Sequence, residues 1–320
     1  MHKNRHLIAA ISLCACAAGA LAQGYPNRPL RVLVGFPAGG PIDVQARILG
    51  QKISQSLGQA VIVDNRPGAD GIVATQAVAK ADPDGYTLLL ASIGFATVPG
   101  LHPKLPYDPV KDFAPVIYAA SGAMVLVASS SVPATDLKSL LALARERPGQ
   151  ITYGSAGIGS SNHLGLELLA RRAGVKMHHV PYKGAAPATT DLLAGHLNIM
   201  LNPINNALPQ VRAGKLRALA VSTAKRAAAM PTTPAIGETI AGYDVSLWSG
   251  FFAPAGTRPE VIELLNREIA AALAVPEVQK ALNEQGFETA GGSPAGFGAL
   301  VGAELKRWSA FVAQEGIKLE

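Results

Sequence analysis

Two patterns of apolar residues alternate along the chain and predict its secondary structure. Short apolar runs, such as residues 30–36, are typical of parallel strands that are covered on both faces. Between these runs lie segments such as 43–58, where apolar residues recur at helical spacing and Gly58 ends the pattern. Over residues 30–92 the order is strand, helix, strand, helix, strand, which predicts a parallel sheet with helices on both faces.

The same order of elements begins again after about residue 123, beyond a proline-rich stretch at 102–115. The repetition predicts an α/β protein with two lobes, in which a cleft would receive a ligand at the carboxyl ends of the strands. An uncharged run at 113–131 is long enough to raise the question of a membrane span. Pro115 and Gly122 interrupt it, so two buried strands joined by a turn fit it better.

The composition narrows the class of protein. Hydrophobic residues make up 49% of the chain and charged residues only 16%, so the chain can bury a large core and is not disordered. The net charge of +6 is mild for 320 residues, and no block of like charges exists to follow a phosphate backbone. A nucleic-acid binder is therefore disfavoured.

Residues 1–22 have the features of a secretory signal peptide: a basic head with Lys3 and Arg5, an apolar stretch, and Ala-Leu-Ala before the cleavage point. Cleavage there lowers the net charge from +6 to +4 and removes the two cysteines, Cys14 and Cys16. Lipoprotein processing at Cys16 is an alternative, but Ala-Leu-Ala is the better cleavage site. An exported chain without disulfides fits a globular protein of the periplasm.

A first candidate site lies where the strand at 30–36 breaks into a glycine-rich turn. Gly39 and Gly40 let the backbone approach a ligand, Pro41 suits the first position of a helix, and Asp43 can bond back to the free amides of the turn. Free amides at the positive end of a helix suit a carboxylate or phosphate. The turn alone is equally consistent with a strand–helix connection that binds nothing.

A second turn of the same kind, at 152–164, lies in the other predicted lobe. Its presence favours a ligand-binding site over two connections that bind nothing. It offers hydroxyl groups and glycine amides at Ser155, Ser160, Ser161, Gly154, Gly157 and Gly159. His163 falls in the first turn of the following helix, where the helix end favours a neutral imidazole; packing or capping is its alternative role. Two anion-binding turns on facing lobes would hold a ligand with a carboxylate at each end. Ser92 and Thr97 could add donors to the cleft, and Lys183 could bias it toward anions.

Other kinds of site find less support. The pattern G-x-x-G-x-G at 154–159 is not the dinucleotide fingerprint, and no phosphate-binding lysine follows either turn. An exported α/β hydrolase is the main rival, but the chain has no G-x-S-x-G elbow around Ser92 or Ser155. His163 and Glu167 share a helix face without a third metal ligand, so a hydrogen bond between them is the better interpretation.

An ordered set of motifs from residue 25 to 320 resembles one known family. They include "RVLVGFPAGGPIDVQAR", "ITYGSAGIGSSNHLGLELL", "HVPYKGAAPATTDLLAGHLNIM" and "WSGFFAPAGT". The chain is similar to substrate-binding receptors of the tripartite tricarboxylate transporter system, the Bug receptors. The resemblance implies an α/β, two-lobed periplasmic-binding-protein fold of the type II kind, without catalysis, cofactor or metal. It further implies a receptor whose lobes close on a small organic acid and deliver it to a membrane permease. The sequence leaves the oligomeric state open, and a monomer is the simple expectation.

The resemblance also implies where the ligand lies. Lobe 1 would comprise residues 23–122 and 247–320, and lobe 2 residues 123–246. The first turn would contact one carboxylate, partly through water, and the second would hold the ligand from the other lobe. The motifs and the resemblance together give these candidate ligand-binding residues: Phe36, Pro37, Ala38, Gly39, Gly40, Asp43, Ser92, Ser155, Ala156, Gly157, Gly159, Ser160, Ser161, His163, Tyr182, Lys183 and Asn202. Ala38 and Leu201-Asn202 depart from the family pattern of a second proline and Phe-Asp; a neutral Asn202 gives less reason to bind an amino group.

Overall fold

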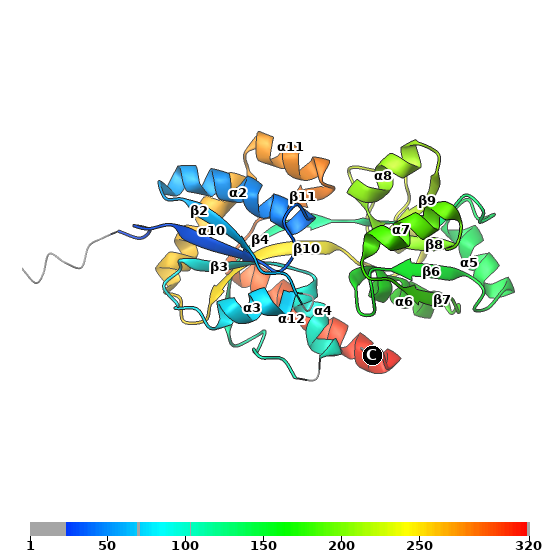
Figure 1. The fold of residues 1–320 in the computed structure, drawn as a ribbon, viewed down its shortest axis with the longest axis horizontal. Helices are drawn as coiled ribbons and strands as arrows, with labels where there is room; N and C mark the ends of the chain where they lie inside the picture. Colours follow the sequence, from blue (N-terminus) through cyan, green and yellow to red (C-terminus); the bar gives the residue numbers. More distant parts are fainter. Residues whose placement is uncertain (1–23, 69–70, 103, 319–320) are drawn as a thin grey trace, which may run out of the picture.

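The computed structural model describes residues 24–68, 71–102 and 104–318, and it contains two β-sheets that lie side by side (Figure 1). The signal peptide predicted at 1–22 and its alternative anchor at Cys16 lie outside the described residues. The first sheet has the strand order β11-β4-β10-β3-β1-β2 and the second has the order β7-β6-β8-β5-β9. The molecule is therefore an α/β protein with two lobes, as the alternating pattern predicts.

The first sheet combines a parallel half with an antiparallel half. Strand β1 (Leu30–Val34) lies between β2 (Val61–Asn65) and β3 (Thr87–Ser92), and both pairings are parallel. Strand β10 (Leu247–Pro254) then pairs antiparallel with β3 and with β4 (Phe113–Gly122), and β11 (Phe287–Thr289) adds the edge.

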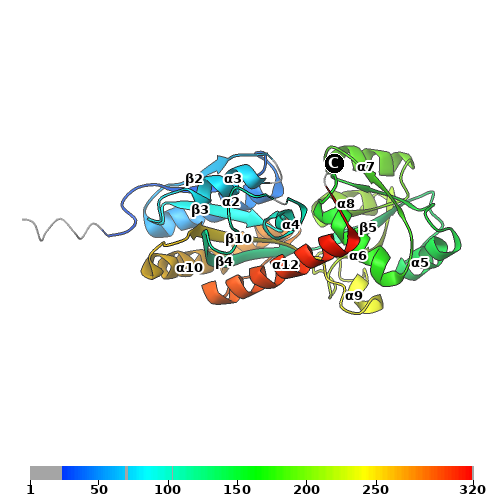
Figure 2. The ribbon, with the colours of Figure 1, turned by 90° about the horizontal axis from the view of Figure 1, so that it is seen from below.

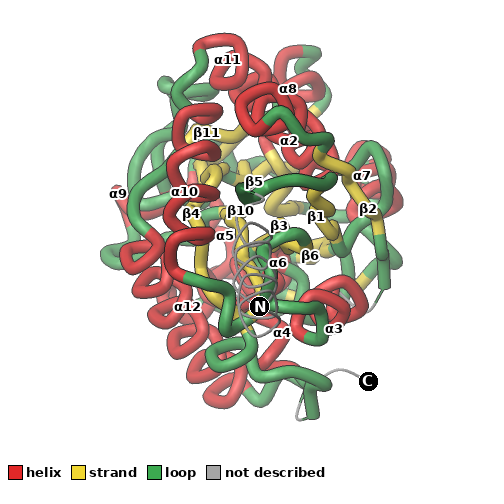
Figure 3. Tube along the Cα trace, turned by 90° about the vertical axis from the view of Figure 1, so that its left-hand side faces the viewer, coloured by secondary structure: helices red, strands yellow, loops and turns green. Residues whose placement is uncertain are grey.

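Helices cover both faces of this sheet, which is the middle layer in an end-on view (Figure 3). One face carries α2 (Pro41–Leu57), α10 (Pro259–Leu273) and α11 (Pro276–Glu284), whose apolar residues share one buried cluster. The other face carries α3 (Ile72–Ala79), α4 (Gly94–Leu101) and α12 (Pro294–Glu315). In α2, for example, Ile42, Ala46, Leu49 and Ile53 are buried at helical spacing.

The second sheet contains β5 (Met124–Ser129), β6 (Thr152–Ser155), β7 (His178–Pro181), β8 (Ile199–Pro203) and β9 (Leu216–Val221). Residues of α5 (Leu137–Glu146), α6 (Ser161–Ala173) and α9 (Ile236–Thr239) pack on one face, and residues of α7 (Ala185–Ala194) and α8 (Ile204–Arg212) on the other. The cluster beneath α5 and α6 is continuous with the one beneath α3, α4 and α12, so the two lobes share part of their core.

Three segments join the lobes. The chain passes from β4 directly into β5, and it returns through residues 222–246 into β10. Helix α12 runs from beneath the first sheet toward α6 (Figure 2), where Glu315 forms an ion pair with Arg171. Because β4 and β5 are two strands in different sheets, the uncharged run at 113–131 spans both lobes. In the described part of the chain, the helices are all too short or too polar to cross a membrane.

Three elements differ from the sequence expectations, one of them the short helix α9, which was not predicted. Residues 94–101 form α4, where a strand end and turn were expected, and β11 was not predicted. In α4 the side chains of Phe95, Ala96, Val98 and Leu101 are all buried. A helix that is apolar on every side has no helical periodicity for the sequence to reveal.

Candidate ligand-binding site

A cavity of about 380 Å³ opens where the strands of both sheets end. The first lobe contributes the turns after β1 and β3 together with the ends of β10 and β11, and the second lobe contributes the segments after β6, β7 and β8. Such a place, beyond the carboxyl ends of parallel strands, is where open α/β sheets bind ligands. The lining residues are Phe36, Pro37, Gly40, Pro41, Ile42, Ser92, Ile93, Gly94, Thr97, Val98, Ala156, Gly159, Ser160, Ser161, Asn162, Ala185, Pro203, Leu247, Trp248 and Phe287.

Five helices begin at this cavity. Its lining includes the first residues of α2, α4, α6 and α7, and Pro203, the residue before α8. The amino end of a helix carries a partial positive charge and backbone N–H groups that have no partner within the helix. None of the lining residues in the described part of the chain is charged. The cavity is therefore suited to an anion through helix ends rather than through cationic side chains.

The turn between β1 and α2 is held by Asp43. Its carboxylate accepts hydrogen bonds from the Gly39 amide (2.8 Å), Arg47 Nε (3.0 Å) and Asn65 Nδ2 (2.9 Å). Burial alone would raise the pKa of Asp43, but the hydrogen bonds from Arg47, Gly39 and Asn65 lower it below its usual value. Asp43 is 2% exposed and does not line the cavity. It shapes the turn, as expected from its position, and lies behind the wall that the turn forms.

These bonds decide which amides of the first turn remain for a ligand. The Gly39 amide binds Asp43, and the Gly40 amide donates to the Pro37 carbonyl (3.2 Å). The first hydrogen bond of α2 is donated by Val44 to the Gly40 carbonyl. The amides of Ile42 and Asp43 precede it and lack a partner within the helix.

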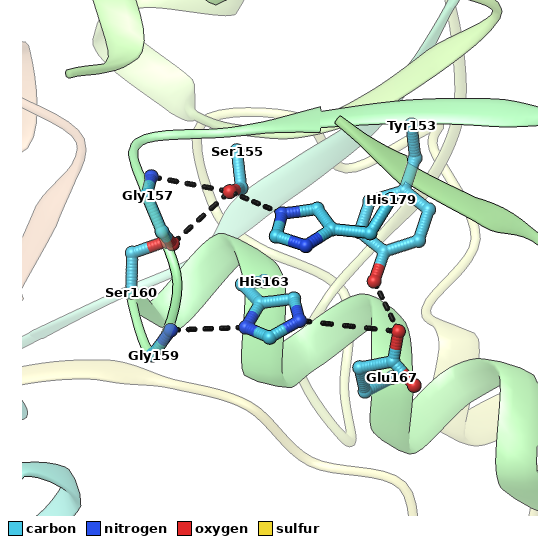
Figure 4. A network of polar contacts seen from close by, with 8 residues as sticks. All are labelled: Tyr153, Ser155, Gly157, Gly159, Ser160, His163, Glu167 and His179. Atoms are coloured by element: carbon cyan, nitrogen blue, oxygen red, sulfur yellow. Dashed lines mark hydrogen bonds and ion pairs between the residues drawn. The ribbon is translucent and has the colours of Figure 1, made fainter. Parts of the chain in front are cut away.

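The turn between β6 and α6 is tied together from within (Figure 4). The Gly157 amide donates to Ser155 Oγ, the Gly159 amide to His163 Nδ1, and the Ser160 hydroxyl to the Gly157 carbonyl. Asn162 Oδ1 accepts from the Ala156 amide (3.1 Å).

The prediction that the glycine amides of this second turn are available to a ligand therefore needs correction. The amides of Gly157 and Gly159 donate hydrogen bonds to side chains of the turn itself. Both glycines have positive φ angles, of 133° and 81°, which favour glycine. The first hydrogen bond of α6 is donated by Leu164, so the amides of Ser161, Asn162 and His163 are the ones left without a helical partner.

Two stacked histidines, His163 and His179, form hydrogen bonds with this turn. The rings of His163 and His179 lie 3.9 Å apart, and His179 Nε2 is 2.6 Å from Ser155 Oγ. Burial, with a smaller contribution from the neighbouring His179, lowers the pKa of His163 to about 3, and burial, with a smaller contribution from His178, lowers the pKa of His179 to about 4. His163 is neutral, as expected, but the cause is burial rather than the helix end alone.

Glu167 closes the network on its other side. It accepts a hydrogen bond from the Tyr153 hydroxyl, and its Oε1 lies 3.9 Å from His163 Nε2. Because His163 Nδ1 accepts from the Gly159 amide, the ring proton belongs on Nε2, facing Glu167. No three histidine, cysteine or acidic side chains gather into a metal-binding group within the described residues.

The Ser155–His179 contact has the length expected of a nucleophile and its base, so it bears on the hydrolase alternative. Ser155 is completely buried and does not line the cavity, and the faces of His179 are stacked against Tyr153 and His163. Ser92 does line the cavity, but no histidine does so among the described residues. Ser155 and His179 thus stabilise the turn through their hydrogen bonds, and Ser155 does not face the cavity, where a substrate would lie.

The candidate residues divide into two groups. Those that line the cavity are Phe36, Pro37, Gly40, Ser92, Ala156, Gly159, Ser160 and Ser161. Those that lie behind or beside it are Ala38, Gly39, Asp43, Ser155, Gly157, His163, Tyr182, Lys183 and Asn202.

The last three candidates have other partners or positions. The Tyr182 hydroxyl donates to Asp191 Oδ2 (2.6 Å), Lys183 is exposed, and the buried Asn202 donates from Nδ2 to Thr189 Oγ1 (3.0 Å). The neutral amide of Asn202 therefore packs against α7 and leaves the cavity wall to its neighbour Pro203.

Several lining residues were not expected from the sequence. They include Ile42, Ile93, Val98, Asn162, Ala185, Pro203, Leu247, Trp248 and Phe287. Trp248 lay in a motif that carried the family resemblance, but nothing in its spacing placed it beside the two turns. Most of the others are apolar residues that a sequence pattern assigns to the core.

Two α/β lobes around a cavity that is lined by helix ends define a solute-binding protein. Residues 45–317 match the family described as "Tripartite tricarboxylate transporter family receptor", and this chain belongs to that family. It is 37% identical to the protein BugT of Bordetella pertussis over 315 residues, which cover 97% of this chain and 96% of BugT.

Solved structures agree with this assignment. A Rhodopseudomonas palustris protein bound to adipate, Rpa4515, matches with a TM-score of 0.82 and 36% identity, covering 92% of this chain and all of that one. MatC from Rhodopseudomonas palustris, bound to malate, matches with a TM-score of 0.77 and 32% identity, covering 90% of this chain and all of MatC.

Proposed function

We propose that this receptor captures a small carboxylic acid between its lobes and delivers it to a permease of the tripartite tricarboxylate type. The observation that carries the proposal is the convergence of five helix amino ends on one cavity without a charged side chain in its described lining. Helix ends of this kind favour anions. Relatives bound to adipate and to malate, both carboxylic acids, support the same class of ligand.

The donors for the carboxylate are the amides that begin the helices. The amides of Ile42 and Asp43 in α2, and those of Ser161 and Asn162 in α6, precede the first helical hydrogen bond of each helix. The hydroxyls of Ser92 and Thr97 add neutral donors, and ordered water can bridge the remaining distance. A site of dipoles and hydroxyls holds an anion without a fixed counter-charge, which suits a protein that must later release it.

Lobe closure would bring the two groups of donors together. The lobes are assigned as residues 23–122 with 247–320 and residues 123–246, and their joints lie near 122–124 and 246–247. The second turn already packs on the first lobe, because a Cβ atom at Gly159 would lie 2.3 Å from Leu101 Cδ1 of α4. Bending at these joints would therefore change the distance between Ser160 and the turn at Gly40.

The remaining parts of the assignment follow from export and from family membership. Residues 1–22 would direct the chain to the periplasm, where it would act as a monomer and without catalysis. Its partners would be the carboxylic acid and the permease, with no cofactor, metal or nucleic acid.

Thermal unfolding in the presence of a panel of organic acids tests the carboxylate proposal. A ligand that binds only the folded state at a hundred times its Kd adds about 2.7 kcal/mol to the free energy of unfolding, so the Tm rises with ligand concentration. The panel includes adipate and malate, with a neutral sugar and an amine as controls. If a sugar or an amine raises the Tm and none of the acids does so, the proposal is wrong.

The hydrolase alternative has a separate test. Purified protein is assayed with small esters, alongside Ser155→Ala and Ser92→Ala. Turnover that either substitution abolishes would establish catalysis and overturn the assignment as a receptor alone.

A further inference from the structure

We propose that the cavity selects acids whose carbon body carries no hydroxyl groups, and that it discriminates against hydroxylated acids of the same length. The inference rests on the proposed function, because it concerns the body of the carboxylic acid in that same cavity. It follows from the apolar walls, the placement of the polar side chains, and the shortage of hydrogen-bond acceptors.

Large apolar side chains make up most of the wall. They come from four segments of the first lobe and are Phe36, Ile42, Ile93, Val98, Leu247, Trp248 and Phe287. Trp248 and Phe287 are only 3% and 4% exposed, so they are packed into the protein and present fixed surfaces. The second lobe adds Ala156, Ala185 and Pro203. A ligand body that touches these side chains loses its contact with water, and the polar side-chain atom that they contain, the indole Nε1 of Trp248, is a donor and cannot accept a proton from a hydroxyl group.

The polar side chains of the lining are confined to two places. Ser92 and Thr97 lie beside the start of α4, and Ser160, Ser161 and Asn162 lie at the start of α6. Two of these groups already have partners, since Asn162 Oδ1 accepts from the Ala156 amide and the Ser160 hydroxyl donates to the Gly157 carbonyl. The polar groups can thus meet the carboxylates of a ligand but are not spread along its body.

The described lining also lacks charged carboxylates, which are the strongest hydrogen-bond acceptors. Helix amino ends present N–H groups, and a carboxylate accepts from them. An alcohol must in addition donate its own proton, which requires an acceptor. The side-chain acceptors of the described lining are the serine, threonine and asparagine oxygens near the starts of α4 and α6, and the apolar side chains of the wall offer none. A buried hydroxyl group without an acceptor costs enough to weaken binding by roughly tenfold.

Calorimetric titration with matched pairs of acids tests this inference. The pairs are adipate with galactarate, succinate with tartrate, and hexanoate with gluconate; within each pair the carbon chain and carboxylates are the same and only hydroxyl groups are added. We expect the hydroxylated member to bind about tenfold more weakly or not at all, in every pair with a measurable member. Equal or tighter binding of galactarate, tartrate or gluconate would overturn the inference while leaving the carboxylate receptor intact. If none of these or other acids binds, the proposed function itself fails, and the inference with it.

A substitution in the wall sharpens the test. Val98→Thr replaces a methyl group with a hydroxyl group of similar size at a lining residue that is 2% exposed. We expect it to reduce the preference for the unhydroxylated member of the binding pair by about threefold, because the new oxygen can accept a hydrogen bond. Val301→Thr in α12, at a buried position outside the cavity, is the control and should leave the ratio unchanged. If Val98→Thr does not fold, the ratios of the wild-type protein decide the question.

Discussion

The two turns that face each other across the cavity have the same role in the fold but are held by different chemistry. The turn before α2 depends on one carboxylate, Asp43, which binds a guanidinium group, an amide side chain and a backbone amide. The turn before α6 depends on neutral groups, in which Ser155, His179 and His163 are buried together. In both turns the glycine amides donate to side chains of the same turn or the helix that follows it. The first amides of the following helix have no partner within that helix. The first should tolerate acid until a carboxyl group is protonated, whereas the second should weaken as soon as a buried imidazole gains a proton.

The largest expected effect comes from Gly159, which is the contact between the second turn and the first lobe. In Gly159→Ala the new Cβ would lie 2.3 Å from Leu101 Cδ1, at a φ of 81° that side chains rarely adopt. We expect ligand affinity to fall by about a hundredfold, because the turn and the lobe must move apart. Titration calorimetry with a bound acid measures this.

Gly174→Ala is the matched control for that substitution. Gly174 also has a positive φ of 63°, but a Cβ there would meet no atom within 4 Å. It should share the backbone cost of about 1 kcal/mol and retain ligand affinity. Similar losses of affinity in both variants would show that the contact with Leu101 is unimportant.

The second prediction concerns pH and separates the two turns. The folded-state pKa values of His163 and His179, about 3 and about 4, lie below the value of about 6.5 in an unfolded chain. Their contribution to stability is therefore complete above pH 6.5 and is lost as the pH falls toward these folded values. For His163 this corresponds to roughly 1.4 kcal/mol of unfolding free energy for each pH unit in that window.

Denaturant unfolding of the wild type and of His163→Gln at several pH values between 7 and 4 measures this loss. The variant should have a shallower dependence on pH, because it lacks one of the titrating groups. Parallel slopes for the two proteins would contradict a neutral, buried His163. Asp43 should not contribute in this window, since its lowered pKa places its loss of stability below about pH 4.

The smallest expected effect comes from the first turn. Asp43→Asn keeps the shape of the side chain but removes the charge that Arg47 binds and one of its acceptor oxygens. We expect ligand affinity to fall by about tenfold, because the turn that positions the amide of Ile42 loosens. Asp64→Asn is the control: Asp64 also binds arginines, Arg31 and Arg66, but it lies on β2 outside the cavity. An equal loss in both variants would mean that the effect is general destabilisation.

Much of the fold follows from the sequence because its signals are local. The alternation of apolar runs and helical periods predicted strands such as β1 and helices such as α2, and the repetition predicted two α/β lobes. Helix α4 was not predicted because it has no charged residue and five of its eight residues are buried, which leaves no polar face to mark a helical period. The two turns were found because glycine, proline and serine mark the place where a strand ends and a helix begins.

The sequence by itself determined which segments are suited to an anion. A glycine- or serine-rich turn followed by the start of a helix is recognisable from consecutive residues. Only the tertiary structure decided which groups line the cavity. Asp43, Ser155 and His163 do not line the cavity. Four apolar residues from distant segments do line it: Ile93, Val98, Trp248 and Phe287. The physical reason is that hydrogen bonds inside a turn compete with a ligand for the same donors. Which donors are used depends on neighbours that are distant in the sequence: Asn65 binds Asp43 across 22 residues, and His179 binds Ser155 across 24 residues.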